Sequence, residues 1–154
     1  FNELDSYIRT KIFPTLPPRA RPTKQNEVGM VDVGAMPKRE VVFFDETINW
    51  FAYTWYFQRY LMYYHLPVIS FFNHVKSLPP GADVFVPLRQ AGMEGVYYIF
   101  SVSDDVLDPI KKGMSDMRGA ETSFAKYLDE KGYAIDEIRG GKGKIAFRVY
   151  YMPL

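Results

Sequence analysis

Hydrophobic positions repeat at two periods along the chain, and the two periods separate strands from helices. Strand period is clearest near the C-terminus, where residues 133–139 and 144–151 flank a Gly-Gly-Lys-Gly turn. In the second of these segments apolar side chains alternate with Arg148 and other outward positions. We predict a β-hairpin here.

An earlier pair of segments, residues 84–88 and 96–102, alternates in the same way around a glycine-containing loop. We predict a second hairpin, with Pro87 placing its first strand at an edge. Between the hairpins a helix is expected to start at Asp108-Pro109 and to end at Gly132. Its apolar face comprises Ile110, Met114, Met117, Phe124 and Leu128.

The middle of the chain has helical period. Short strands are predicted at residues 28–33 and 40–44, followed by a helix over residues 47–66 and a second over residues 67–78. Pro67 suits the break between the two helices. The only Asp, Glu, Lys or Arg between residues 47 and 75 is Arg59, so the helix must be buried on several sides.

Aromatic residues concentrate in this middle part. Of 26 aromatics in 154 residues, 13 lie between residues 43 and 72. Buried aromatics carry much of the energy of cores and interfaces. We therefore predict as core or interface anchors Trp50, Trp55, Phe57 and Tyr60. Contact with a membrane surface and a membrane span remain alternatives, although Arg59 disfavours a span.

Residues 1–40 differ from the rest, because they hold five of the 11 prolines and little periodicity. A short helix is expected at residues 2–13 and an extended segment after it. Residues 9–24 contain five basic residues and no acid. These are the predicted contacts of a basic arm: Arg9, Lys11, Arg19, Arg21 and Lys24. The sequence thus predicts an N-terminal arm over residues 1–40 and a single domain over residues 41–154.

The fold class predicted is α+β. We expect an antiparallel sheet of hairpins, packed against the aromatic-rich helix pair and the helix of the C-terminal half, with an extended N-terminal arm.

Charge and composition exclude several functions. A net charge of +1 gives no strong field for nucleic acid or membranes, and the absence of cysteine excludes thiolate catalysis and disulfides. His65 and His74 lack zinc-site spacing, and the lysine-containing turn at residues 140–144 lacks the P-loop pattern. Asp108 and its acidic neighbours fit a loop and helix cap. No catalytic residue, metal ligand or cofactor is predicted, and an enzyme of another type stays open.

The C-terminal hairpin carries a second group of basic residues. Its candidate anion contacts are Arg139, Lys142, Lys144 and Arg148. Nucleic-acid binding needs basic side chains near stacking aromatics, but the aromatic segment lacks such charges.

We therefore expect a non-catalytic structural or interaction subunit of a larger multi-protein assembly, such as an accessory subunit of an organellar or membrane-associated complex. The alternatives are a viral structural protein or a nucleic-acid-binding protein. Protein subunits are the expected partners, and an organelle or a virion is the expected location. The first residue, Phe1, fits a removed targeting peptide, release from a precursor, or an incomplete start.

Overall fold

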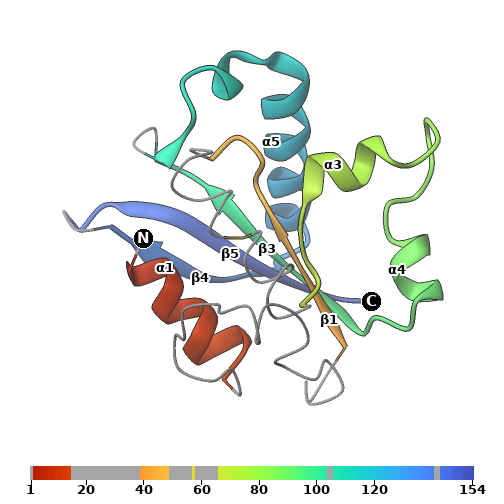
Figure 1. Ribbon diagram of the computed structural model, residues 1–154, viewed down its shortest axis with the longest axis horizontal. Helices are drawn as coiled ribbons and strands as arrows, with labels where there is room; N and C mark the ends of the chain where they lie inside the picture. The colour runs from red at the N-terminus through yellow and green to blue at the C-terminus, as the bar shows by residue number, and fades with distance from the viewer. Residues whose placement is uncertain (1, 15–38, 49–56, 58–65, 104–105, 141–142) are drawn as a thin grey trace, which may run out of the picture.

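A computed structural model describes residues 2–14, 39–48, 57, 66–103, 106–140 and 143–154 (Figure 1). The helices in this part of the chain are α1 (Asn2–Tyr7), a π-helical turn η1 (Ile8–Ile12), α3 (Phe71–Lys76), α4 (Val86–Gln90), a 3₁₀ turn η5 (Lys111–Gly113) and α5 (Ser115–Glu130). The strands are β1 (Glu40–Phe44), β2 (Val68–Ser70), β3 (Gly95–Ser101), β4 (Ala134–Arg139) and β5 (Ile145–Pro153).

The five strands form one sheet in the order β2-β1-β3-β5-β4. β1 pairs in parallel with β2 and β3, so that Phe44 lies opposite Ser70 on one side and Ile99 on the other. β5 is antiparallel to both β3 and β4. The α+β class is confirmed, but the expected antiparallel sheet of hairpins is wrong, because the sheet is mixed. The parallel pairs join segments far apart in sequence, which periodicity alone does not pair.

The C-terminal hairpin is confirmed as β4 and β5. The other predicted hairpin is wrong: β3 does form, but residues 86–90 are helix α4 rather than its partner strand. Pro87 lies in the first turn of this helix, where the missing amide is tolerated. Asp83 stabilises the turn that precedes α4, since its Oδ1 accepts a hydrogen bond of 2.9 Å from the amide of Phe85.

The helix predicted over residues 67–78 is divided in the structure. Val68–Ser70 forms β2, and the helix α3 begins only at Phe71. Ser70 ends the strand and caps the helix, because its Oγ accepts a hydrogen bond of 3.2 Å from the amide of Asn73. Similarly, α5 begins at Ser115 rather than at Asp108, which instead caps the preceding turn through the amides of Ile110 and Lys111.

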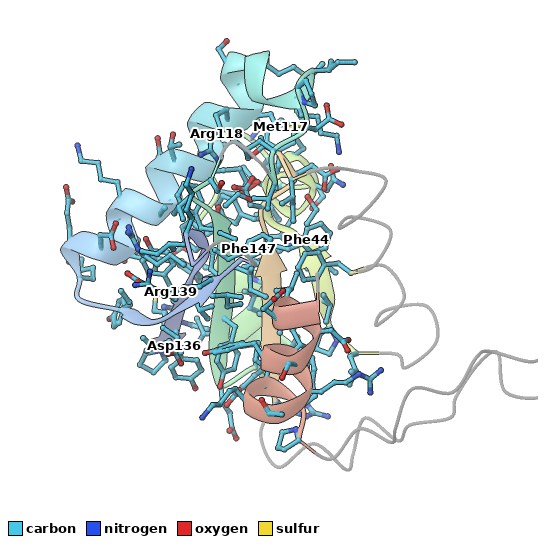
Figure 2. All side chains as sticks on the ribbon, turned by 90° about the vertical axis from the view of Figure 1, so that its left-hand side faces the viewer. Phe44, Met117, Arg118, Asp136, Arg139 and Phe147 are labelled. Carbon is cyan, nitrogen blue, oxygen red and sulfur yellow. The ribbon has the colours of Figure 1, made fainter. Side chains whose placement is uncertain are left out.

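The sheet is covered on both faces (Figure 2). α5 and α3 cover one face, where Phe71 and Phe124 stack with ring centroids 4.1 Å apart. α1 and η1 cover the other face. All five residues of β1 are buried, as expected for a strand between two covered faces.

The helix predicted at residues 2–13 is confirmed as α1 with η1, and it belongs to the core. Leu4 and Ile8 are 0% and 1% exposed and pack with β1 and β5 side chains. Phe57 lies in the same core and stacks on Phe44 at 4.5 Å. Three predicted segments lie outside the described residues. They are the part of the predicted helix between Ile48 and Leu66 other than Phe57, the extended segment after Pro14, and the predicted strand 28–33.

Candidate functional site

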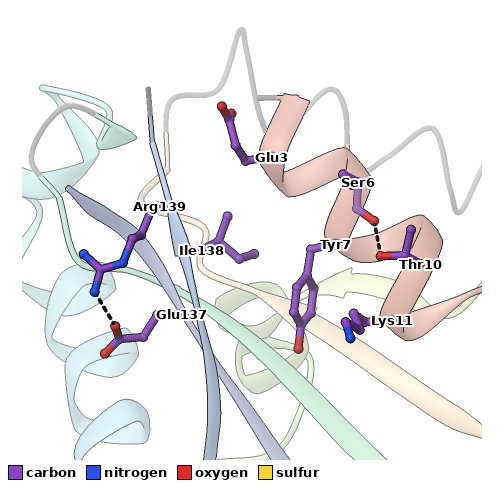
Figure 3. A pocket seen from close by; sticks show the side chains of 8 residues that line it. All are labelled: Glu3, Ser6, Tyr7, Thr10, Lys11, Glu137, Ile138 and Arg139. Carbon is purple, nitrogen blue, oxygen red and sulfur yellow. Dashed lines mark hydrogen bonds and ion pairs between the residues drawn. The ribbon is translucent and has the colours of Figure 1, made fainter. Parts of the chain in front are cut away.

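A groove of about 460 Å³ separates the N-terminal helix from the edge strand β4 (Figure 3). Its helical wall consists of Glu3, Ser6, Tyr7, Thr10 and Lys11. Its other wall consists of Glu137, Ile138 and Arg139. The groove therefore brings a predicted arm residue, Lys11, to the same surface as a predicted hairpin residue, Arg139.

Helix geometry places the groove wall. Leu4, Ile8 and Ile12 occupy the buried stripe of the helix, which turns Ser6 and Thr10 outward. Figure 3 shows Ser6 and Thr10 on the helix side of the groove and Ile138 on the strand side, with the Tyr7 side chain between them in this view. The apolar stripe therefore determines how the helix packs on the sheet and which polar side chains line the groove.

One hydrogen bond joins the two walls. The hydroxyl of Tyr7 donates to Asp136 Oδ2 at 2.9 Å. Burial first, and then the Asp136 carboxylate, raise the pKa of Tyr7 above its ordinary value of 10.0. The hydroxyl therefore stays protonated at physiological pH and keeps donating to Asp136.

β4 is the outer strand of the sheet, and its far side has no pairing strand among the described residues. Backbone N–H and C=O groups of an edge strand alternate between the neighbouring strand and the open side. Ile138 is the one buried residue of β4, at 5% exposed, and it forms the apolar floor of the groove. The edge thus offers free backbone groups beside a small apolar patch.

Charges of both signs line the groove. Arg139 donates to the carbonyl of Gly143 at 2.9 Å and pairs loosely with Glu137 at 3.5 Å. Lys11 is exposed, and no ion pair is observed for it with the described residues. Lys11 is therefore the groove cation most available to a partner.

The other predicted contacts lie elsewhere. Arg9 turns back to Asp5 at 3.3 Å on its own helix. Arg148 faces Asp129 of α5 at 3.8 Å, on the opposite face of the sheet from α1, and Lys144 is exposed near the hairpin turn. The predicted residues outside the described part of the chain are Arg19, Arg21, Lys24, Lys142, Trp50, Trp55 and Tyr60.

A buried polar cluster lies where β1 and β3 end. Asp45 is 0% exposed, and both of its carboxylate oxygens accept hydrogen bonds. One oxygen accepts from the amide and hydroxyl of Thr47. The other accepts from the amide of Ser101 at 3.2 Å and from Arg118 at 2.9 Å. Arg118 therefore ties α5 to the ends of two strands.

Glu121 occupies the next turn of α5 and is also 0% exposed. It accepts from the Tyr98 hydroxyl and from the Glu46 amide, each at 2.8 Å. Burial, followed by repulsion from the Asp45 carboxylate, raises the pKa of Glu121 from 4.5 to about 9. The side chain is therefore protonated at neutral pH.

The protonated carboxyl fits the hydrogen bonds around it. Tyr98 also lies 3.3 Å from the backbone carbonyl of Glu121. A neutral Glu121 can donate to the Tyr98 oxygen, and the Tyr98 hydroxyl can then donate to that carbonyl. The Glu121 carboxyl group thus has hydrogen-bond partners for both of its oxygens, and the contacts of Arg118 and Glu121 hold α5 on the sheet.

This cluster is not among the predicted site residues. Its signal was Glu121, which falls between Met117 and Phe124 on the predicted apolar face of the helix. An acid in a buried stripe needs a partner inside the protein. Arg118, three residues earlier, borders the same face and is a candidate for such a buried polar contact. Its guanidinium also packs over the Phe100 ring, 4.8 Å from the ring centroid.

The described part of the chain contains no group of three or more His, Cys, Asp or Glu side chains placed to hold a metal ion. No helix within that part is long and apolar enough to cross a membrane. Comparison of the chain with family models, with curated proteins and with solved structures finds no match.

Proposed function

We propose that this protein is a non-catalytic interaction subunit that binds an extended segment of a partner protein along β4. The groove between α1 and the edge strand carries this proposal, because it combines open backbone groups, an apolar floor and an available cation. An added strand would pair with the backbone of β4, as in other cases of strand addition to a sheet edge.

The groove also indicates the chemistry of the segment. An apolar side chain of the partner would lie over Ile138, and an acidic side chain would lie opposite Lys11. Backbone pairing supplies affinity in this mode, and the side chains supply register and specificity. Glu137 and Arg139 flank Ile138 and would disfavour a segment of uniform charge.

A protein partner fits this surface better than nucleic acid does. Lys11 and Arg139 share the groove with Glu3 and Glu137, whereas phosphate binding requires an excess of positive charge. Membership of a larger assembly, as an accessory subunit or as a viral structural protein, would use the same edge and is part of the proposal.

The proposal can be tested with peptides selected from a random library for binding to the full chain. Peptides are expected to carry an acid near an apolar residue, and to shift the amide resonances of residues 134–139. Reversing the charge with Lys11→Glu should weaken binding about tenfold, and exchanging the peptide acid for lysine should restore it.

Lys126→Glu is the matched control, because Lys126 is exposed on α5, away from the groove. It should leave the peptide affinity unchanged. Selected peptides that shift resonances of α5 but not of β4, or a library that yields no binder, would contradict the proposal.

A further inference from the structure

The last residues of β4 place an acid and a base on either side of an isoleucine. Ile138 turns towards α1 and belongs to the core on that face of the sheet. Glu137 lies opposite Arg148 of β5 and turns to the other face, as does Arg139, whose Nη2 lies 3.5 Å from Glu137 Oε2 (Figure 3). The side chains of Glu137 and Arg139 are 39% and 59% exposed, so both charges can reach a partner at the edge.

The backbone of β4 offers its open hydrogen-bonding groups at the same two charged residues. The amide of Gly140 donates to the carbonyl of Lys144, on the β5 side of the hairpin, at 2.8 Å. The direction of these groups alternates along a strand, so Ile138 also bonds towards β5. The amides and carbonyls of Glu137 and Arg139 therefore point to the open side, where an added antiparallel strand would bond to them.

We infer that β4 pairs antiparallel with β4 of a second copy of this chain, about a two-fold axis at Ile138. This inference rests on the proposed function, because it uses the same edge and names β4 itself as the segment that is bound. In this register Glu137 of each copy lies opposite Arg139 of the other, and the two Ile138 residues oppose each other. Unlike charges directly opposite each other stabilise a pair of strands.

Charge selects this register among the symmetric ones. Residues opposed in an antiparallel pair share a face of the sheet, so the two-fold axis passes at a residue and not between two residues. An axis at Asp136 or at Glu137 would oppose two acids, and an axis at Arg139 would oppose two bases, which is unfavourable. Among the residues from Asp136 to Arg139, only an axis at Ile138 opposes no like charges.

The groove leaves space for the N-terminal helices in such a dimer. The axis is perpendicular to the sheet, so both copies of α1 lie on the same face, each separated from its own β4 by the groove of about 460 Å³. The two grooves then meet over the paired Ile138 residues. In the view of Figure 3, Ile138 lies between the levels of Glu3 and Lys11 on the helix. Since the axis reverses direction, Glu3 of one copy and Lys11 of the other lie towards the same end, which adds a second complementary pair of charges.

The test is sedimentation equilibrium of the full chain over a range of concentrations. The mass should rise from 17.9 kDa towards twice that value. The dissociation constant is expected in the micromolar range, since the paired edge is short. As the dimer forms, the amides of Glu137 and Arg139 should become protected from hydrogen exchange, because their open groups gain partners.

Two charge reversals test the register. Glu137→Lys opposes two bases at both charged pairs of the dimer, and Arg139→Glu opposes two acids, so each variant alone should dimerise about tenfold more weakly. An equimolar mixture of the two variants should recover the wild-type affinity, because the mixed dimer again opposes unlike charges. The residues within each chain are the same alone and in the mixture, so recovery reports a contact between chains. The control Lys126→Glu, on α5, should dimerise as the wild type does.

Several results would overturn the inference. One is a chain that stays monomeric at about 1 mM; selected peptides that still bind β4 would then leave the proposed function intact. Another is a dimer that both charge reversals leave unchanged, which would place its interface elsewhere. A third is a mixture of the two variants that dimerises no better than either variant alone.

Discussion

Replacing Glu121 with glutamine should change how stability depends on pH. The pKa of Glu121 is raised from 4.5 to about 9 by burial and by the Asp45 carboxylate. Between these two values the folded protein holds a proton that the unfolded chain releases. Because the pKa of Glu121 is higher in the folded protein than in the unfolded chain, its contribution to stability is complete below pH 4.5. This contribution is lost as the pH rises towards about 9, the pKa in the folded protein.

The structure sets the size of the effect. One proton taken up on folding corresponds to a slope of about 1.4 kcal/mol per pH unit. From about pH 6 to about pH 8, the free energy of unfolding of the wild type should therefore fall by about 3 kcal/mol relative to Glu121→Gln. The glutamine can keep both contacts of the protonated acid, because its carbonyl oxygen accepts from the Glu46 amide and its NH2 group donates to the Tyr98 oxygen.

The assay is urea denaturation followed by circular dichroism at several pH values. Glu130→Gln provides the control, because Glu130 is exposed on the same helix and its removal should leave the slope unchanged. If the wild type and Glu121→Gln differ by a constant amount across this range, Glu121 is already ionised in the folded protein and the assignment of its proton is wrong.

Two further substitutions probe the core and the polar cluster. Phe57→Ala should lower the free energy of unfolding by about 4 kcal/mol, because Phe57 is 0% exposed and stacks on Phe44. A loss below about 1 kcal/mol, measured by urea denaturation, would show that the ring is not in the core. Arg118→Met should lower the free energy of unfolding by about 3 kcal/mol, because it leaves Asp45 buried without its cation. The control Lys126→Met, at an exposed position, should lower it by less than about 0.5 kcal/mol. Equal losses of stability in thermal melts of the two variants would contradict this reasoning.

Elements with strong local signals were predictable from sequence. The β4–β5 hairpin has its glycine turn and its alternation within one short segment, and Gly143 has the positive φ, +75°, that glycine allows. α1 was visible from the spacing of Leu4 and Ile8. In both cases, the residues that determine the element lie inside the element.

The parts that were not predicted depend on distant residues. β2 is a strand because β1 pairs with it, and the Val-Ile-Ser segment alone also suits a helix. Alternation over residues 84–88 favours a strand, although Asp83 and Pro87 are also signals of a helix start. The groove could not be predicted either, because Lys11 and Arg139 are brought together only when α1 packs beside β4.

The hydrogen bond between Tyr7 and Asp136 spans 129 residues of sequence. During synthesis the chain emerges from its N-terminal side, so α1 exists long before the strand against which it packs. Its apolar stripe, including Leu4 and Ile8, lacks the part of its packing surface that β4 and β5 supply until these strands have left the ribosome. Contacts of such long range slow folding, and nascent chains expose apolar surface in the meantime. We therefore expect α1 to dock last, so that a chain halted before β4 keeps its N-terminal helix available to chaperones.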